Sequence, residues 1–121
     1  MRVREAAMRL KRFEAEEKVQ RVHDLKQMIG EFEIMATDLD KQIAAEEERT
    51  GVRDKSHFAY STFARSAAQR RENLLASVQD LRDRLENAVV ERDEALAELD
   101  QADAVGLRDT SRNDSHGAVA R

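Results

Sequence analysis

The sequence contains no proline, no cysteine and no tryptophan, and it has only four glycines among its 121 residues. Proline interrupts helices because it lacks a backbone donor, so its absence permits long unbroken helices. Without cysteine the chain can form neither a disulfide nor a thiolate metal site. It also has no apolar run approaching the roughly 18 residues of a membrane span. Its basic start lacks the apolar core of a secretory signal, so we expect a soluble cytoplasmic protein.

The residues that are abundant favour helices. Charged residues make up 38% of the chain, and the formal net charge is only −4. Alanine, leucine, glutamate and arginine dominate, and these are strong helix formers. Such a composition is typical of coiled coils when the apolar residues follow a heptad spacing. The mild net charge does not favour wholesale binding of nucleic acid phosphates.

A first helix is predicted over about residues 3–49. Its second half has an apolar seam whose spacing alternates three and four, the heptad pattern: Val22, Leu25, Ile29, Phe32, Ala36, Leu39 and Ile43. Its first half has apolar residues in a different phase: Val3, Ala6, Leu10 and Phe13. A change of phase locally alters the supercoil or weakens the packing.

A turn is predicted over about 50–56 and a second helix over about 57–105. Gly51 can adopt the left-handed conformation that ends a helix, and Asp54 or Ser56 can cap the next one. The start of the second helix falls at either Ser56 or Ser61. Residues 106–121 are polar and lack periodicity, which predicts a disordered tail.

The second helix has a heptad seam along its whole length: Tyr60, Ala64, Ala67, Arg71, Leu74, Val78, Leu81, Leu85, Ala88, Arg92, Ala95, Leu99 and Ala102. Two of its members are arginines, which we expect to extend to the edge of the seam and fix the register. Two long helices joined by a short loop fold back antiparallel. This folding pairs Leu39 with Ala67, Phe32 with Leu74, Leu25 with Leu81 and Leu10 with Leu96. The predicted fold class is therefore all-α, an antiparallel coiled-coil hairpin.

Two clusters are candidates for binding partners. The first is the basic arm at the start of the chain, which contains only one acidic residue, Glu5. Its five basic residues are Arg2, Arg4, Arg9, Lys11 and Arg12. It can bind an acidic protein surface, nucleic acid or anionic lipid, or simply be solvated. The second is the aromatic cluster beside the turn: Phe58, Tyr60 and Phe63. Only Tyr60 is in phase with the seam, so the other two either pack over the turn or form an exposed anchor for a partner.

No catalytic or cofactor site is predicted. The three histidines are scattered, and a metal held by Glu46, Glu47, Glu48 and His57 is a weak alternative to a solvated acidic helix end. A hairpin of two helices encloses no volume of the hundreds of cubic ångströms that substrate pockets need. We therefore expect a protein that is not an enzyme and has no cofactor or resident metal.

Six segments together resemble a known family: RLKRF at 9–13, MIGEF at 28–32, MATDLD at 35–40, EEERTG at 46–51, HFAY at 57–60 and QRRENL at 69–74. They are similar to the flagellar type III export stalk proteins, the FliJ family, in their α-proteobacterial form. The likeness spans about residues 4–99. The heptads are shared by any coiled coil, whereas the strings beside the turn are more particular.

The resemblance implies an antiparallel coiled coil that acts in bacterial flagellum biogenesis. It implies three kinds of partner: the hexameric export ATPase, the membrane export gate and export chaperones. The protein would then be cytoplasmic and peripheral at the inner membrane through its partners, without binding nucleic acid. The basic arm would meet the ATPase ring, and the aromatic cluster the gate. A generic coiled-coil scaffold, or a binder of nucleic acid or membrane surface, remains the alternative.

Overall fold

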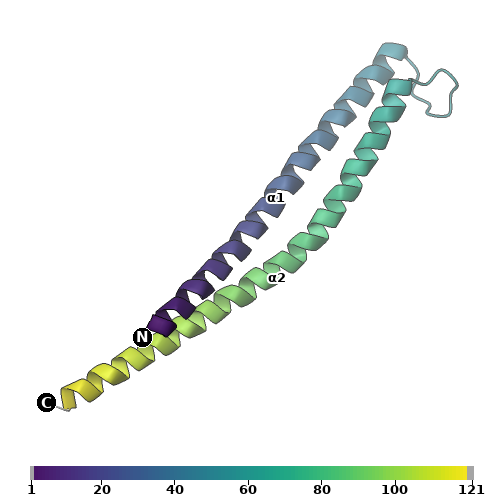
Figure 1. The fold of residues 1–121 in the computed structure, drawn as a ribbon. Helices are drawn as coiled ribbons and strands as arrows, with labels where there is room; N and C mark the ends of the chain where they lie inside the picture. Colours follow the sequence, from purple (N-terminus) through teal and green to yellow (C-terminus); the bar gives the residue numbers. More distant parts are fainter. Residues whose placement is uncertain (1, 120–121) are drawn as a thin grey trace. The chain divides into compact units, whose positions relative to one another are not determined.

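The chain forms two long helices joined by a loop, as seen in a computed structural model (Figure 1). The structure describes the backbone of residues 2–119 and the side chains of residues 2–106. Helix α1 spans Arg2–Thr50 and helix α2 spans Thr62–Val119. The described residues form no strand, and the helices pack as an all-α antiparallel hairpin, which confirms the predicted fold class.

Local hydrogen bonds explain where α1 ends and α2 begins. Gly51 follows α1 with a φ of 75°, and its N–H donates to the Glu47 carbonyl at 2.9 Å. This left-handed glycine ends the helix as the sequence predicts. The N-cap of α2 is Ser61, whose Oγ accepts a hydrogen bond from the Ala64 N–H at 3.1 Å. The predicted caps at Asp54 and Ser56 are therefore wrong, whereas the alternative start of the helix at Ser61 is confirmed, because α2 begins at Thr62 rather than at about 57.

The two helices form two compact units. The first unit comprises Asp24–Leu85. Its core follows the predicted seams, because most seam residues of both helices are buried and the others are half-buried. The buried ones are Leu25, Ile29, Ala36, Leu39, Tyr60, Ala64, Ala67, Val78 and Leu81. Arg71 is half-buried on the seam, and its Nε lies 2.5 Å from the Asp40 carboxylate of α1. This ion pair across the helices supports the role in register predicted for Arg71.

The second unit comprises Met1–His23 and Glu86–Arg121. Among its described side chains only Ala15, Val22 and Ala88 are buried. The remaining inward positions are half-buried and include Met8, Lys11 and Lys18 of α1. Alanine and lysine offer little apolar area, so this seam contributes less to stability than the seam of the first unit.

The first turns of α1 correct the predicted pairing of Leu10 with Leu96. The inward residues Met8, Lys11, Ala15, Lys18 and Val22 keep the three-and-four spacing of the later seam. By contrast, Val3, Leu10 and Phe13 are 84%, 57% and 56% exposed, and Leu96 is 39% exposed. The physical reason is that one continuous helix cannot turn two different faces towards the same neighbour. The out-of-phase residues therefore lie on the outer face.

The far end of α2 also differs from the prediction. The helix continues through Gly106 to Val119, whereas the sequence predicted that it ends at 105 and that 106–121 is disordered. Gly106 does not have a positive φ. A glycine within a helix costs only about 1 kcal/mol relative to alanine, and no proline follows to stop the helix. Residues 120–121 lie outside the described backbone.

Candidate functional site

The loop between the helices is ordered by hydrogen bonds between near neighbours. The Asp54 carboxylate accepts bonds from the Ser56 hydroxyl at 2.7 Å and the Ser56 N–H at 3.0 Å. These two bonds, the hydroxyl first, lower the pKa of Asp54. The His57 Nδ1 accepts the Ala59 N–H at 3.0 Å, and Arg65 of α2 donates to the Lys55 carbonyl at 3.0 Å. The loop backbone is thus fixed along its length.

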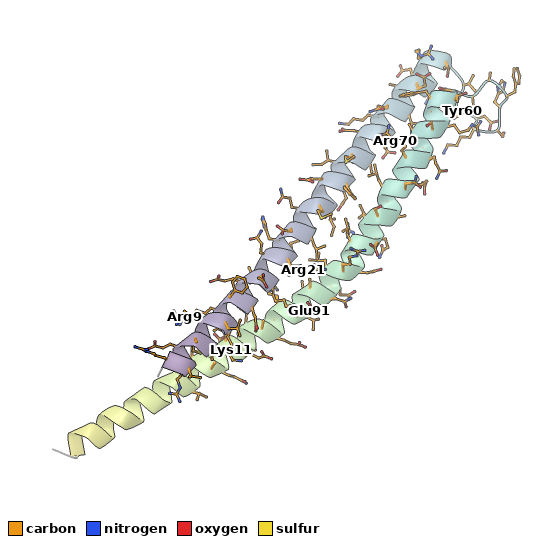
Figure 2. The ribbon with its side chains drawn as sticks, in the orientation of Figure 1. Arg9, Lys11, Arg21, Tyr60, Arg70 and Glu91 are labelled. Carbon is orange, nitrogen blue, oxygen red and sulfur yellow. The ribbon has the colours of Figure 1, made fainter. Side chains whose placement is uncertain are left out.

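Tyr60 anchors this loop to the hairpin (Figure 2). Its side chain is 6% exposed, and its hydroxyl donates to the Glu47 carboxylate of α1 at 3.3 Å. The Arg65 guanidinium lies 5.5 Å from the ring centroid, within cation–π range. Desolvation by burial, followed by the negative charge of Glu47, raises the pKa of Tyr60. Tyr60 is therefore a structural residue, as its seam position indicates.

A second anchor joins the start of α2 to the end of α1. The Ser61 hydroxyl donates to the Glu46 carboxylate at 3.0 Å, and Arg49 donates to the same carboxylate. These bonds, the one from Arg49 first, lower the pKa of Glu46. Ser61 thus caps α2 and holds α1 with the same hydroxyl. The Glu46 and Glu47 carboxylates at the end of α1 therefore both accept hydrogen bonds from within the protein.

The other two aromatics of the cluster are exposed. Phe58 is 96% exposed, and its ring stacks on the neighbouring His57 ring with the centroids 4.7 Å apart. Phe63, on the first turn of α2, is 55% exposed. Neither ring closes the tip of the hairpin by burial, which favours the exposed-anchor interpretation over packing at the turn. A fixed backbone that presents an exposed aromatic ring is suited to binding a partner, because little entropy is lost on docking.

The basic arm lies on the first three turns of α1. Arg9 and Lys11 point to different sides of the helix, Arg9 being exposed and Lys11 half-buried (Figure 2). The Arg12 guanidinium lies 3.9 Å from the Asp103 carboxylate of α2. Arg2 and Arg9 form no ion pair within 4 Å with any side chain that the structure describes. Part of the arm thus pairs across the hairpin, and part faces outwards.

The facing segment of α2 is acidic. It carries Glu91, Asp93, Glu94, Glu98, Asp100 and Asp103. Lys18 forms an ion pair with Glu91 at 3.2 Å, and both side chains are substantially exposed. Arg92 on this segment is half-buried and contacts Asp93, its neighbour along the chain. An exposed ion pair contributes only about 0–1 kcal/mol, so these pairs leave the surface charge available to a partner.

Within residues 2–106, whose side chains are described, histidine, aspartate and glutamate nowhere gather in a group of three able to hold a metal ion, and this includes the segment 46–48 with His57. The described helices also contain no stretch long and apolar enough to cross a membrane.

Comparisons with known proteins identify no relative. No protein family matches this chain, and neither a curated protein nor a solved structure is significantly similar to it.

Proposed function

We propose that this chain is a protein-binding component of the bacterial flagellar export apparatus, without catalytic activity of its own. Its basic arm binds the export ATPase ring, and the exposed aromatics Phe58 and Phe63 bind the export gate. The observation that carries the proposal is the 96% exposure of Phe58 on a loop fixed by hydrogen bonds. The flagellar assignment itself is supported by the resemblance of the sequence segments to the export stalk family.

The loop supports binding through an aromatic anchor. Interface residues that dominate binding are enriched in aromatics and are held in place before the partner arrives. Tyr60 and the Asp54 turn fix the backbone on either side of Phe58. Phe58 therefore offers a large apolar surface that is costly to leave in water. In this proposal, the export gate protein provides an apolar pocket that receives the Phe58 side chain.

The basic arm supports binding to a ring through charge. In the second unit, which contains the basic arm, the arginines make α1 positive and the carboxylates make α2 negative. An asymmetric surface inside a six-fold ring cannot contact all six subunits alike. It can favour ring assembly or sequential hydrolysis without taking part in the chemistry. In this proposal the same protein also helps export chaperones reach the apparatus, and it associates with the membrane only through its partners.

A pull-down from a lysate of flagellated cells tests this proposal. The wild-type protein should retain the export ATPase and the gate protein. Replacing Phe58 and Phe63 with alanine should release the gate protein but keep the ATPase. The matched control is Ile34→Ala, which removes an apolar side chain that is 64% exposed on the outer face of α1.

Three results would contradict the proposal in different ways. Retention of an unrelated protein alone would favour a generic coiled-coil scaffold. Retention of nucleic acid with a steep salt dependence would favour a nucleic-acid binder. Loss of the gate protein with Ile34→Ala, but not with the Phe58 and Phe63 variant, would place the contact on α1 instead.

A further inference from the structure

We propose that the exposed apolar residues at the start of α1 are a docking surface for an acidic amphipathic helix of another protein. This surface, the outer stripe, consists of Val3, Ala6, Leu10 and Phe13. The inference rests on the proposed role of the basic arm in protein binding and names the partner segment by its secondary structure and charge.

The outer stripe has the spacing of a coiled-coil seam. Its members are separated by three, four and three residues, which places them at the a and d positions of two successive heptads. Val3, Leu10 and Phe13 are all more than half exposed, and Ala6 is exposed as well. A helix that carries such a stripe ordinarily buries it against another helix. The stripe is therefore the right size and shape for one helical segment of a partner.

The side chains of α2 that the structure describes, up to residue 106, do not cover this surface. The residues of α1 that face α2 in this unit are Met8, Lys11, Ala15 and Lys18, which are half-buried or buried. Met8 and Ala15 occupy the f position of the heptad that starts at Val3, and the f position lies opposite a and d. The first turns of α1 thus have one face for α2 and the opposite face free for a second helix.

The charges beside the outer stripe specify an acidic partner. In the same heptad, Arg2 and Arg9 lie at g positions, so both follow one edge of the stripe. Residues at this edge form ion pairs with the helix docked on the stripe and determine which partner is chosen. The other edge carries Ala7 and Glu14, which supply no second basic row. A partner helix with glutamate or aspartate facing Arg2 and Arg9 matches the surface.

A second copy of this chain matches less well. Two outer stripes packed antiparallel would set Arg2 and Arg9 of one copy against the same residues of the other, and like charges repel. Packed parallel, only Arg9 would face an acid, Glu14 of the other copy, while Arg2 would face Ala7. The acidic segment of α2 has the correct charge but no matching seam. Its exposed large apolar residues are Val90, Leu96 and Val105, whose separations of six and nine residues do not follow a heptad. We therefore assign the occupant to a different protein.

Two synthetic peptides test the charge and the spacing together. Each has about 21 residues, or three heptads, because shorter isolated helices are marginal in water. Both carry leucine at a and d; one carries glutamate at e and g, and the other lysine. Fluorescence anisotropy measures the binding of each labelled peptide to the full-length protein. The glutamate peptide should bind at least about tenfold more tightly than the lysine peptide, a preference that salt should reduce.

Three variants separate the contributions of the outer stripe and its edge. Leu10→Ser with Phe13→Ser should weaken binding of the glutamate peptide by at least about tenfold, as expected for the loss of central apolar anchors. The control Ile34→Ser removes an equally exposed apolar residue from the same helix and should leave binding unchanged. Arg2→Glu with Arg9→Glu should reverse the preference, so that the lysine peptide binds more tightly.

Several outcomes would overturn the inference. One is equal binding of the two peptides, and another is unchanged binding by the Leu10 and Phe13 variant. A third is a dimer in sedimentation that the same variant abolishes, because a second copy would then occupy the outer stripe. The peptide assay is independent of flagellar proteins. If the peptides bind as expected but the pull-down retains neither the ATPase nor the gate protein, this inference stands and the proposed function is contradicted.

Discussion

Truncating one leucine in each unit tests which face of α1 is buried. Leu10 and Leu25 lie on the same helix, but Leu10 is 57% exposed and Leu25 is 6% exposed. The two substitutions, Leu10→Ala and Leu25→Ala, remove the same atoms and improve helix propensity equally. Any difference in the free energy of unfolding therefore reports burial.

The expected magnitudes do not overlap. Truncating a buried leucine to alanine costs about 2–5 kcal/mol, because the cavity adds to the lost transfer free energy. The side chain of Leu10 keeps more than half of its exposure, so its loss should cost about 1 kcal/mol or less. Leu81→Ala on α2, at 6% exposed, provides a second buried reference. It should destabilise the protein about as much as Leu25→Ala.

Urea unfolding followed by circular dichroism at the helical band measures all three variants. The protein concentration is kept low and constant, so that self-association does not contribute to stability. An equal loss for Leu10→Ala and Leu25→Ala would refute the reasoning. It would mean that the outer stripe is buried in the folded protein and that it is not available to a partner.

Two further predictions concern the loop. Tyr60 is the only tyrosine and the chain has no tryptophan, so phenolate absorbance reports this residue alone. Because burial and then Glu47 raise its pKa, Tyr60 should ionise above its ordinary value of about 10. The stability that depends on the neutral phenol is present below pH 10 and is lost as the pH rises through the folded pKa. Glu47→Gln should lower the pKa only in part, and an ordinary value in the native wild type would contradict the burial of Tyr60. Replacing both Phe58 and Phe63 with alanine should cost less than about 1 kcal/mol in urea, whereas a loss of several kcal/mol would mean that these rings pack over the turn.

The sequence predicts the hairpin well because two strong signals agree. Matched heptad seams in Asp24–Leu85 define the buried faces, and Gly51 marks the end of α1. The off-seam positions of Phe58 and Phe63 leave two interpretations open, packing over the turn or exposure, and the structure shows both side chains exposed. These features depend on local spacing, which is readable without knowing the neighbouring helix.

The sequence predicts the second unit, Met1–His23 with Glu86–Arg121, less well, because its best apolar residues are not its buried ones. Leu10 and Phe13 have higher hydrophobicity than Lys11 and Ala15, yet Ala15 is buried and Lys11 is half-buried. The continuity of α1 decides this, and hydrophobicity alone does not show it. The outer stripe was therefore mistaken for half of the intramolecular seam. The only available signal was its separate phase, which the sequence does show.

The sequence leaves the start of α2 open between Ser56 and Ser61 and misses its end, for a related reason. Three residues near the turn, Asp54, Ser56 and Ser61, are all good N-caps, and spacing alone does not choose among them. The loop uses Asp54 and Ser56 for its own turn, which leaves Ser61 to cap the helix. At the other end, one glycine is a weak stop signal when no proline follows it.

The ATPase activity of the purified export ring is the most direct test of the proposed action of the basic arm on that ring. The variant reverses all five charges of the arm to glutamate. The control reverses five exposed basic residues elsewhere, all within Asp24–Leu85: Lys26, Lys41, Arg53, Lys55 and Arg70. Circular dichroism should show both proteins folded, since exposed ion pairs such as Arg12 with Asp103 contribute only about 0–1 kcal/mol.

We expect the wild-type protein and the control both to stimulate ATP hydrolysis, and this stimulation to decline as salt rises. The variant with the reversed arm should stimulate it little or not at all. Full stimulation by that folded variant, or no stimulation by the wild-type protein, would contradict the claim.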